Sequence, residues 1–262
     1  MKARAITIAG SDPGGGAGIQ ADLKTFTAFK VYGMSAITSV TVQNTLGVRG
    51  AHNVPPPVVE EQMDAVLSDI GADAAKTGML ATAQVIRAVA GRLKAHGVKR
   101  LVVDPVMYAK SGHALLEPAA VGALIKELLP LALVITPNAP EAQRLSGVKV
   151  TDAASARRAA RAIRALGPRY VLVKGGHLGG EVCEDLLFDG RSFTAHRSPR
   201  VNTRNTHGTG CTLSAAIAAG LALGADPREA VREGIAYVAG AIKQALPLGG
   251  GHGPLDHCWR MR

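Results

Sequence analysis

A short glycine-rich segment ahead of a long run of small apolar residues carries the densest chemistry in this chain. Residues 205–211 are Asn-Thr-His-Gly-Thr-Gly-Cys, and the residues that follow have the composition of a helix. Glycines let the backbone approach a ligand closely with successive N–H groups facing it, and a helix N-terminus adds partial positive charge. Gly208, Thr209 and Gly210 therefore predict a site for a phosphate or a transferring phosphoryl group.

Cys211 follows these glycines, and we expect it in the first turn of the helix, where the helix field favours the thiolate. A thiolate there could accept the proton of an attacking hydroxyl. The alternative is a glycine-rich turn followed by a buried structural cysteine, and the local sequence does not decide between the two. Other phosphate motifs are excluded, because Leu213 replaces the third glycine of the dinucleotide fingerprint and no Gly-x4-Gly-Lys-Ser/Thr string occurs.

A second glycine-rich loop, Gly10 to Gly18, follows the first predicted strand. Such a loop can form a close wall around a flat ligand, and Asp22, one helical turn beyond it, could accept hydrogen bonds from an amino or hydroxymethyl group. A flexible connector with an exposed aspartate is the alternative. Gln43 ends the second strand, and its carboxamide offers a donor and an acceptor together, as recognition of a heterocycle edge requires. A polar turn residue explains Gln43 equally well.

Further polar groups follow other predicted strands, each with a plain structural alternative. Met79 could pack against a ring or fill the core. Asp104 could hold a metal ion through water or cap a strand, and Glu141 could orient hydrated Mg²⁺ or begin a helix. Lys174 could reach a nucleotide phosphate or lie at the surface. Their convergence on one sheet edge indicates phosphoryl transfer, which needs positioning and charge neutralisation more than covalent chemistry.

The elements that position these groups alternate between β-branched apolar runs and Ala/Leu-rich amphipathic stretches. The predicted strands are 4–9, 37–42, 101–106, 133–136 and 170–174, with a short one ahead of 76–79 and a hairpin formed by 185–188 and 192–195. The predicted helices are 19–31, 58–70, 83–96, 119–129, 153–166, 209–223 and 228–246. This alternation predicts a mainly parallel sheet covered on both faces, with ligands beyond the carboxyl ends of the strands. We expect a single domain over residues 1–262.

Composition limits the function classes. Of 262 residues, 47% are hydrophobic and 19% charged, which excludes intrinsic disorder, and 3% aromatics argues against a stacking platform for single-stranded nucleic acid. The formal charge of +10 suits either polyanionic partners or small anionic substrates. Three cysteines are not a disulfide framework, so we expect a reducing cytoplasm. Neither a signal-peptide core nor an apolar run long enough for a membrane span is found.

These motifs together resemble a known family. The resemblance runs from about residue 4 to residue 256 and rests on Ala9-Gly10-Ser11-Asp12, Gly18 to Lys24, Gln43-Asn44-Thr45, Lys76 to Leu80, Asp104 to Met107, Ala109 to Gly112, Thr136-Pro137-Asn138 with Glu141-Ala142, Lys174 to His177, and Asn205 to Ser214. The set is similar to the hydroxymethylpyrimidine/phosphomethylpyrimidine kinases of thiamine biosynthesis, in the ribokinase-like superfamily. The resemblance implies a three-layer α/β/α sandwich that uses ATP and Mg²⁺. It implies phosphorylation of 4-amino-5-hydroxymethyl-2-methylpyrimidine and then of its monophosphate.

The resemblance also assigns roles to individual residues. It makes Cys211 the catalytic base and Gly208, Thr209 and Gly210 the anion hole. It places Gln43, Asp22, Gly10, Met79 and Val106 around the pyrimidine. It assigns Lys174 to the ATP phosphates, and Asp104, Asn138 and Glu141 to the metal–phosphate region, with Asp104 and Glu141 holding the ion through water. It makes Lys110, Ser111 and Gly112 a mobile flap over the site, and it implies a homodimer. Tyr108 departs from the aliphatic residue expected beside the flap.

Two alternatives remain. A pyridoxine/pyridoxal kinase would share the fold, cofactors and anion hole, although Gln43 and Cys211 favour a pyrimidine. A nucleic-acid-binding protein would need a basic face or a recognition motif. The densest basic cluster is Arg157, Arg158, Arg161 and Arg164, which we interpret as a solvated helix face because no aromatic residues interleave. We therefore expect neither nucleic acid nor a membrane as a partner.

Overall fold

The computed structural model of the protein describes residues 2–109, 112–177 and 179–262. Within these ranges one nine-stranded sheet has the order β3-β2-β1-β4-β5-β6-β7-β8-β9. The strands are β1 (Arg4–Ser11), β2 (Tyr32–Asn44), β3 (Gly47–Asn53), β4 (Ala74–Thr77), β5 (Leu101–Val103), β6 (Val134–Ile135), β7 (Tyr170–Val173), β8 (Val182–Phe188) and β9 (Phe193–Pro199). Strands β2, β1, β4, β5, β6 and β7 pair in parallel, whereas β3, β8 and β9 are antiparallel additions at the two edges.

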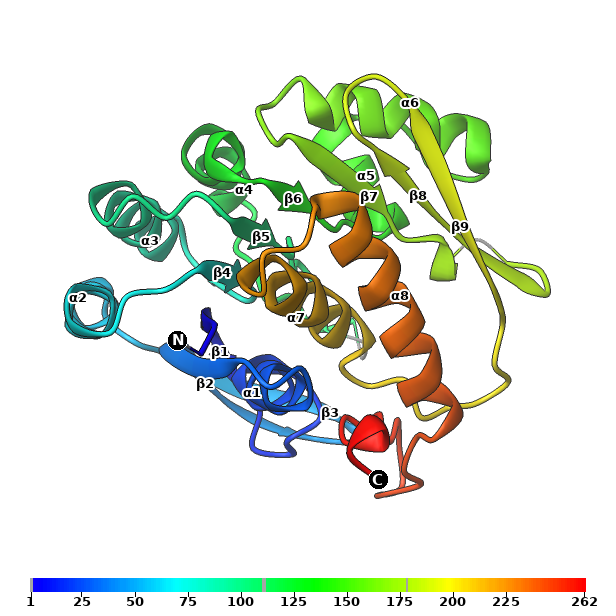
Figure 1. The fold of residues 1–262 in the computed structure, drawn as a ribbon, viewed down its shortest axis with the longest axis horizontal. Helices are drawn as coiled ribbons and strands as arrows, with labels where there is room; N and C mark the ends of the chain where they lie inside the picture. The colour runs from blue at the N-terminus through cyan, green and yellow to red at the C-terminus, as the bar shows by residue number, and fades with distance from the viewer. Residues whose placement is uncertain (1, 110–111, 178) are drawn as a thin grey trace.

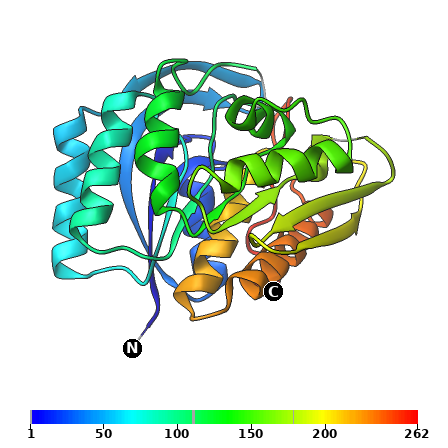
Figure 2. The same ribbon diagram turned by 90° about the horizontal axis from the view of Figure 1, so that it is seen from above.

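The helices cover both faces of this sheet (Figures 1 and 2). They are α1 (Gly18–Ala28), α2 (Pro56–Asp69), α3 (Ala83–Ala95), α4 (Ala120–Ala123), α5 (Ala139–Ser146), α6 (Ala153–Arg164), α7 (Thr209–Ala222) and α8 (Pro227–Lys243). One apolar core joins the sheet to α2–α6, and the other joins it to α1, α7 and α8. The predicted three-layer α/β/α sandwich with a mainly parallel sheet is confirmed. No helix in the described ranges is both long and apolar enough to cross a bilayer.

The central strands are short and buried on both faces, as their apolar sequences require. All three residues of β5 are fully buried, and the two residues of β6 are as well. A strand buried on both faces must be apolar at consecutive positions, and this explains why the runs at 101–103 and 134–135 were recognisable as strands. The predicted hairpin is also confirmed, since Phe188 pairs with Phe193 across Asp189-Gly190.

Three elements differ from the prediction, and one of them is helix α5, which was not among the predicted helices. The helix expected over 119–129 is α4 followed by a π-helical turn, Leu124–Leu128, and a 3-10 turn, Leu129–Leu131. Pro130 lacks an N–H and cannot continue an α-helix, so the end of this segment changes its hydrogen bonding. Strand β3 was not predicted, because it is mostly exposed and lacks apolar alternation; it is ordered by antiparallel pairing with β2.

The arginine cluster of α6 is not simply a solvated face. The guanidinium groups of Arg157 and Arg161 lie 4.8 and 5.0 Å from the ring centroid of Phe193 on β9. Cation–π contacts of this kind cover the ring and hold α6 on the hairpin. Two of the four arginines therefore have a packing role that the spacing alone did not indicate.

Candidate active site

The carboxyl ends of the parallel strands meet around one cavity of about 1220 Å³. Loops after β1, β4, β5 and β6, the ends of β2 and β7, and the first turn of α7 contribute to its wall. The predicted site residues that line it are Gly10, Gln43, Met79, Asp104, Val106, Asn138, Glu141, Lys174, Gly208, Thr209, Gly210 and Cys211. The edge of the sheet thus brings together groups that are about two hundred residues apart in the sequence.

The glycine-rich segment before α7 forms a helix N-terminus at this cavity. Gly208 is the N-cap of the 14-residue α7, with a left-handed φ of 82° that favours glycine. A Cβ at Gly208 would overlap the carbonyl oxygen of Gly16, so the two glycine-rich loops lie directly against each other. The amide end of α7 carries the partial positive charge that suits an anion.

Cys211 lies in the first turn of α7, as predicted, but its electrostatics differ from the expectation. Burial raises the pKa of the Cys211 thiol to about 11, although the Lys76 ammonium group and a hydrogen bond from the Gly18 backbone N–H oppose this shift. The negative charges of Asp22 and Asp104 act in the same direction as burial. The thiol form is therefore favoured in the unliganded chain, because desolvation and two nearby carboxylates outweigh the Lys76 charge and the Gly18 hydrogen bond.

Asp22 does not line the cavity, contrary to its predicted role beside the pyrimidine. Its Oδ2 atom lies 2.7 Å from Nζ of Lys76 and 2.6 Å from Oγ1 of Thr7, and both Asp22 and Lys76 have 0% exposed side chains. Burial raises the pKa of Asp22. Burial alone would lower the pKa of Lys76, but the charge and hydrogen bond of Asp22, together with the nearby Cys211 and Asp104, outweigh it and leave the Lys76 pKa raised. Asp22 is thus the counter-ion of Lys76, which does line the cavity.

Lys76 is a functional candidate that the sequence reasoning missed. It was expected after a short strand, whereas it lies inside β4. The sequence feature that could have identified it is a lysine within a run of otherwise small residues, Ala74-Ala75-Lys76-Thr77. Lysine is almost never fully buried unless it is paired, so a lysine in a central strand predicts a buried partner.

One end of the cavity, called the nucleotide end below because the sequence predicts ATP phosphates there, holds a compact charged cluster. Nζ of Lys174 lies 3.0 Å from Oδ1 of Asp104 and 3.9 Å from Oε2 of Glu141. Burial raises the pKa of Glu141 to about 7, against the opposing charge of Lys174. Burial alone would lower the pKa of Lys174, yet Asp104 and Glu141 more than offset it and keep the ammonium charged. This cluster places a charged ammonium group at the cavity wall, where it suits an anionic ligand.

Asn138 and Glu141 both cap the start of α5. Asn138 accepts a hydrogen bond from the Glu141 N–H at 2.9 Å, and Glu141 accepts one from the Asn138 N–H at 2.8 Å, forming a capping box. The helix-start alternative for Glu141 is therefore correct, and the residue still lines the cavity. Asp104 and Glu141 supply carboxylate oxygens at one edge, and a divalent cation would favour the ionised form of Glu141 that burial disfavours. The donor set fits hydrated Mg²⁺.

The acceptor end is built from neutral groups and close backbone contacts. Gly10, Met79, Val106 and Gln43 line it, and a Cβ at Gly10 would lie 3.2 Å from Sδ of Met79. A side chain at position 10 would therefore press against Met79, which would have to shift by a few tenths of an ångström. These residues can form a flat apolar slot with one carboxamide at its edge, a shape that fits a small aromatic heterocycle.

His207 belongs to the glycine-rich segment before α7, and it joins three segments of the chain. Its Nε2 atom lies 2.8 Å from Oδ2 of Asp12 and 3.1 Å from Nε2 of Gln43. Asp12 also accepts hydrogen bonds from the backbone N–H groups of residues 14, 16 and 17. Sequence spacing could not bring residues 12, 43 and 207 together, because their contact depends on the topology of the sheet.

The predicted flap is described in part. Lys110 and Ser111 lie outside the described residues. Gly112 has a left-handed φ of 85° and is not among the residues that line the cavity. Tyr108, the departure from an aliphatic residue, lines the cavity with 58% of its surface exposed, so it stands at the mouth.

Comparison with known proteins gives consistent results. The family model described as phosphomethylpyrimidine kinase matches residues 12–256. A hydroxymethylpyrimidine/phosphomethylpyrimidine kinase of Rhizobium meliloti is 54% identical over 263 residues, which cover 99% of this chain and 98% of the relative. A bifunctional thiamine biosynthesis protein of Geobacter sulfurreducens is 52% identical over 252 residues; these are 96% of this chain and 51% of that protein, so the chain spans about half of its length.

A solved structure also matches over the full chain. The pyridoxal kinase of Staphylococcus aureus in complex with AMP-PCP and pyridoxal has a TM-score of 0.93 and 39% sequence identity, and the match covers 100% of this chain and 96% of that one.

Proposed function

The chain belongs to the phosphomethylpyrimidine kinase family, and from this premise we propose its reaction in detail. It transfers the γ-phosphoryl group of ATP to the hydroxyl of 4-amino-5-hydroxymethyl-2-methylpyrimidine, and then a second group to the resulting monophosphate. One observation carries this proposal: the amide end of α7 with Cys211 opens into the same cavity as the Lys174–Asp104–Glu141 cluster. An acceptor hydroxyl and a nucleotide phosphate can therefore meet between them.

The proposed mechanism uses Cys211 as the proton acceptor. The hydroxyl oxygen forms a bond to the γ-phosphorus as the bond to the ADP oxygen breaks, and the hydroxyl proton passes to the Cys211 sulfur. Gly208, Thr209 and Gly210 direct backbone N–H groups at the charge on the transferring group. Cys211 accepts this proton in its thiolate form, which the Lys76 ammonium group and the Gly18 backbone N–H favour. Because such transition states are loose, the hydroxyl becomes acidic only late in the transfer.

The remaining cavity residues position the two substrates. Lys174 contacts the phosphates of ATP, and Asp104, Asn138 and Glu141 hold the metal–phosphate region. When bound, Mg²⁺ would neutralise phosphate charge, with Asp104 and Glu141 as its carboxylate partners through water. Gln43, Gly10, Met79 and Val106 bind the pyrimidine.

Replacing Cys211 tests this mechanism. We expect Cys211→Ala to lower kcat at saturating substrates by about 100-fold, within the range typical of a general base. Cys258→Ala is the matched control, because Cys258 is exposed and is not among the cavity residues. Turnover of Cys211→Ala near that of the control would exclude the base role.

The acceptor is tested by ATP consumption with three compounds: hydroxymethylpyrimidine, its monophosphate and pyridoxal. We expect both pyrimidines to be turned over, with pyridoxal poorer in kcat/KM. A pyridoxal kinase is the second candidate, favoured by the similarity to the Staphylococcus aureus enzyme. Turnover of pyridoxal above that of both pyrimidines would select this alternative.

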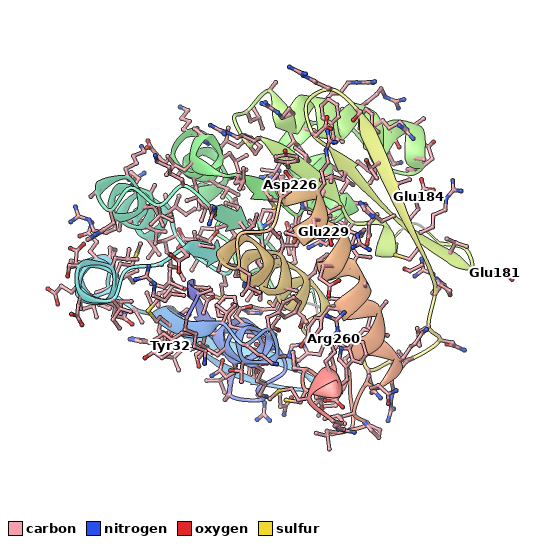
Figure 3. The ribbon with its side chains drawn as sticks, in the orientation of Figure 1. Tyr32, Glu181, Glu184, Asp226, Glu229 and Arg260 are labelled. Carbon is pink, nitrogen blue, oxygen red and sulfur yellow. The ribbon has the colours of Figure 1, made fainter. Side chains whose placement is uncertain are left out.

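We further propose that the protein acts as a homodimer of single-domain chains in the cytoplasm, with no nucleic-acid partner. The outer β2–β3 edge supports self-association, because Val40, Val42 and Leu46 are 49%, 59% and 71% exposed. Figure 3 shows Tyr32, at the start of β2, also at the surface. Light scattering of the protein and of Val42→Lys tests this proposal, with a monomeric wild-type mass as the contrary result. A salt-sensitive gel shift with DNA or RNA would revive a nucleic-acid partner.

A further inference from the structure

Three polar side chains from distant segments meet at the acceptor end of the cavity. Asp12 comes from the loop after β1, Gln43 from the end of β2, and His207 from the segment before α7. His207 Nε2 is 2.8 Å from Asp12 Oδ2 and 3.1 Å from the Gln43 amide nitrogen. All three residues line the cavity.

The proton on His207 is determined by Asp12. Burial would raise the pKa of Asp12, but the hydrogen bonds from His207 and from backbone N–H groups hold it below its usual range. The Asp12 carboxylate is thus ionised and can only accept hydrogen bonds. Nε2 of His207 must then carry a proton, because its lone pair would otherwise face a carboxylate oxygen at 2.8 Å.

This proton determines the orientation of the Gln43 amide. As placed, the Gln43 nitrogen faces the protonated Nε2 of His207, donor against donor, at 3.1 Å. The Gln43 oxygen lies 3.3 Å from Oγ1 of Thr41, whose single hydrogen is already donated to the Ser11 carbonyl at 2.9 Å. Rotating the amide by half a turn exchanges oxygen and nitrogen at almost no change in shape, and it satisfies both contacts. Oε1 then shares the single Nε2 hydrogen of His207 with the closer Asp12 carboxylate, and the NH₂ group donates to Thr41.

We propose that the Asp12–His207 pair is a positioning device that holds the Gln43 amide with its oxygen toward His207, and so sets which acceptor the cavity selects. The amide then presents one remaining N–H and one remaining oxygen lone pair to the cavity. The ligand edge that matches is a ring nitrogen beside an exocyclic amine, which 4-aminopyrimidines have and pyridoxal lacks. This inference rests on the proposed contact between Gln43 and the acceptor.

The first test measures the tautomer of His207 directly in the wild-type protein. Long-range ¹H–¹⁵N spectra of histidine-labelled protein distinguish a ring protonated at Nε2 from one protonated at Nδ1, and the His207→Phe spectrum assigns the signal. We expect a proton at Nε2. A neutral ring with its only proton at Nδ1 would overturn the proposal, whatever the substrate of the enzyme.

The second test is a double-mutant cycle on the Kd of hydroxymethylpyrimidine, measured by calorimetry without ATP. We expect Gln43→Ala and His207→Phe each to weaken binding about tenfold, and the double variant to bind no worse than Gln43→Ala, because His207 acts through Gln43. His207→Gln, which keeps an N–H donor, should restore most of the affinity. His252→Phe is the control, since His252 bonds the Arg204 carbonyl and is not among the cavity residues.

The outcomes separate this inference from the proposed function. If the effects of Gln43→Ala and His207→Phe simply multiply, or if His207→Gln binds as weakly as His207→Phe, the positioning role is wrong while the Gln43 contact stands. If Gln43→Ala leaves the Kd unchanged, the proposed contact itself is wrong. A multiplicative cycle with an Nε2 proton would make His207 a structural residue only.

Discussion

The two ends of the cavity solve the problem of binding in different ways. At the acceptor end, Asp12 accepts hydrogen bonds from three backbone N–H groups and His207. The residues that we propose to contact the ligand there, Gly10, Gln43, Met79 and Val106, are neutral. At the nucleotide end, Lys174 lies between two carboxylates, and burial raises the pKa of Glu141 to about 7 although Lys174 and the Asn138 N–H oppose this rise. The acceptor end is organised for shape and hydrogen-bond direction. The nucleotide end keeps its charges available for phosphate and metal.

Between the two ends lies the buried Lys76–Asp22 pair, and breaking it should have the largest effect on stability. Lys76→Met leaves the Asp22 carboxylate, at 0% exposure, without its counter-charge. Breaking a buried pair from one side typically costs 3–5 kcal/mol, so we expect a loss of about 4 kcal/mol in the free energy of unfolding, measured by urea denaturation.

The matched double variant distinguishes charge from packing. Lys76→Met combined with Asp22→Asn removes both charges while the amide can still accept from Thr7. We expect it to recover about half of the loss. A double variant less stable than Lys76→Met would mean that the ion pair of Asp22 with Lys76 does not account for the loss of stability.

The contrast between these regions also shows what sequence could predict. The glycine-rich turn before α7 is local, and its role at a helix N-terminus followed from residues 208–211 alone. The fate of Asp22 was not local, because whether it faced the ligand or Lys76 depended on β4 lying beside β1. Sequence spacing correctly predicted that Asp22 lies near the site, one turn after the loop. It could not predict that the side chain is buried against Lys76 instead of lining the cavity.

Replacing Lys174 should affect the nucleotide end alone. Lys174→Met removes the ammonium that Asp104 and Glu141 keep charged. Since a hydrogen bond to a charged group contributes about 1.5–3 kcal/mol, we expect KM for ATP to rise roughly 10- to 100-fold. The Kd of the pyrimidine should change less than about twofold, because the acceptor groups do not contact Lys174.

Lys99→Met is the control for Lys174, because Lys99 is exposed and its loss changes the net charge equally. Steady-state kinetics on the three proteins gives the comparison. An equal rise in the KM for ATP in both variants would assign the effect to overall charge. A loss of affinity for the pyrimidine as large as the loss for ATP would show that the two ends of the cavity are energetically coupled.

The protonation of Glu141 makes the stability of the unliganded protein depend on pH. Its pKa is raised from 4.5 to about 7, so between these values the folded chain holds a proton that the unfolded chain releases. The stabilisation from this proton is fully present below pH 4.5 and is lost as pH rises through 7. Relative to Glu141→Gln, the wild type should therefore lose on the order of 2–3 kcal/mol between pH 4.5 and pH 8.

Glu141→Gln is suited to this measurement because glutamine keeps an oxygen that can accept from the Asn138 N–H, so the start of α5 is preserved. The difference in unfolding free energy between the two proteins is measured in metal-free buffer across this pH range. A difference that does not change with pH would show that Glu141 is ionised in the folded protein throughout, contrary to the effect of its burial.

Much of the pattern at the nucleotide end was accessible from sequence, for a physical reason. Asp104, Asn138, Glu141 and Lys174 each follow a short buried strand, and parallel strands bring their carboxyl ends to one edge. The acceptor end was harder, because His207 has no strand of its own and contacts Asp12 only through the packing of two glycine-rich loops. A pattern that depends on loop-on-loop contact leaves no periodicity in the chain.

Salt should have the smallest of the predicted effects, and it should weaken the binding of ATP more than the binding of the pyrimidine. Screening weakens interactions between partly exposed charges, and the Debye length falls from about 10 Å at 0.1 M to about 3 Å at 1 M. With free Mg²⁺ held constant, we expect KM for ATP to rise several-fold between about 0.05 and 0.5 M KCl, because Lys174 and the +10 net charge both attract an anion. The Kd of the uncharged pyrimidine should stay within about 1.5-fold, since directional hydrogen bonds to Gln43 are not screened by mobile ions. A parallel rise in both constants would mean that the acceptor end also depends on charge, and its neutral network would not be what selects the ligand.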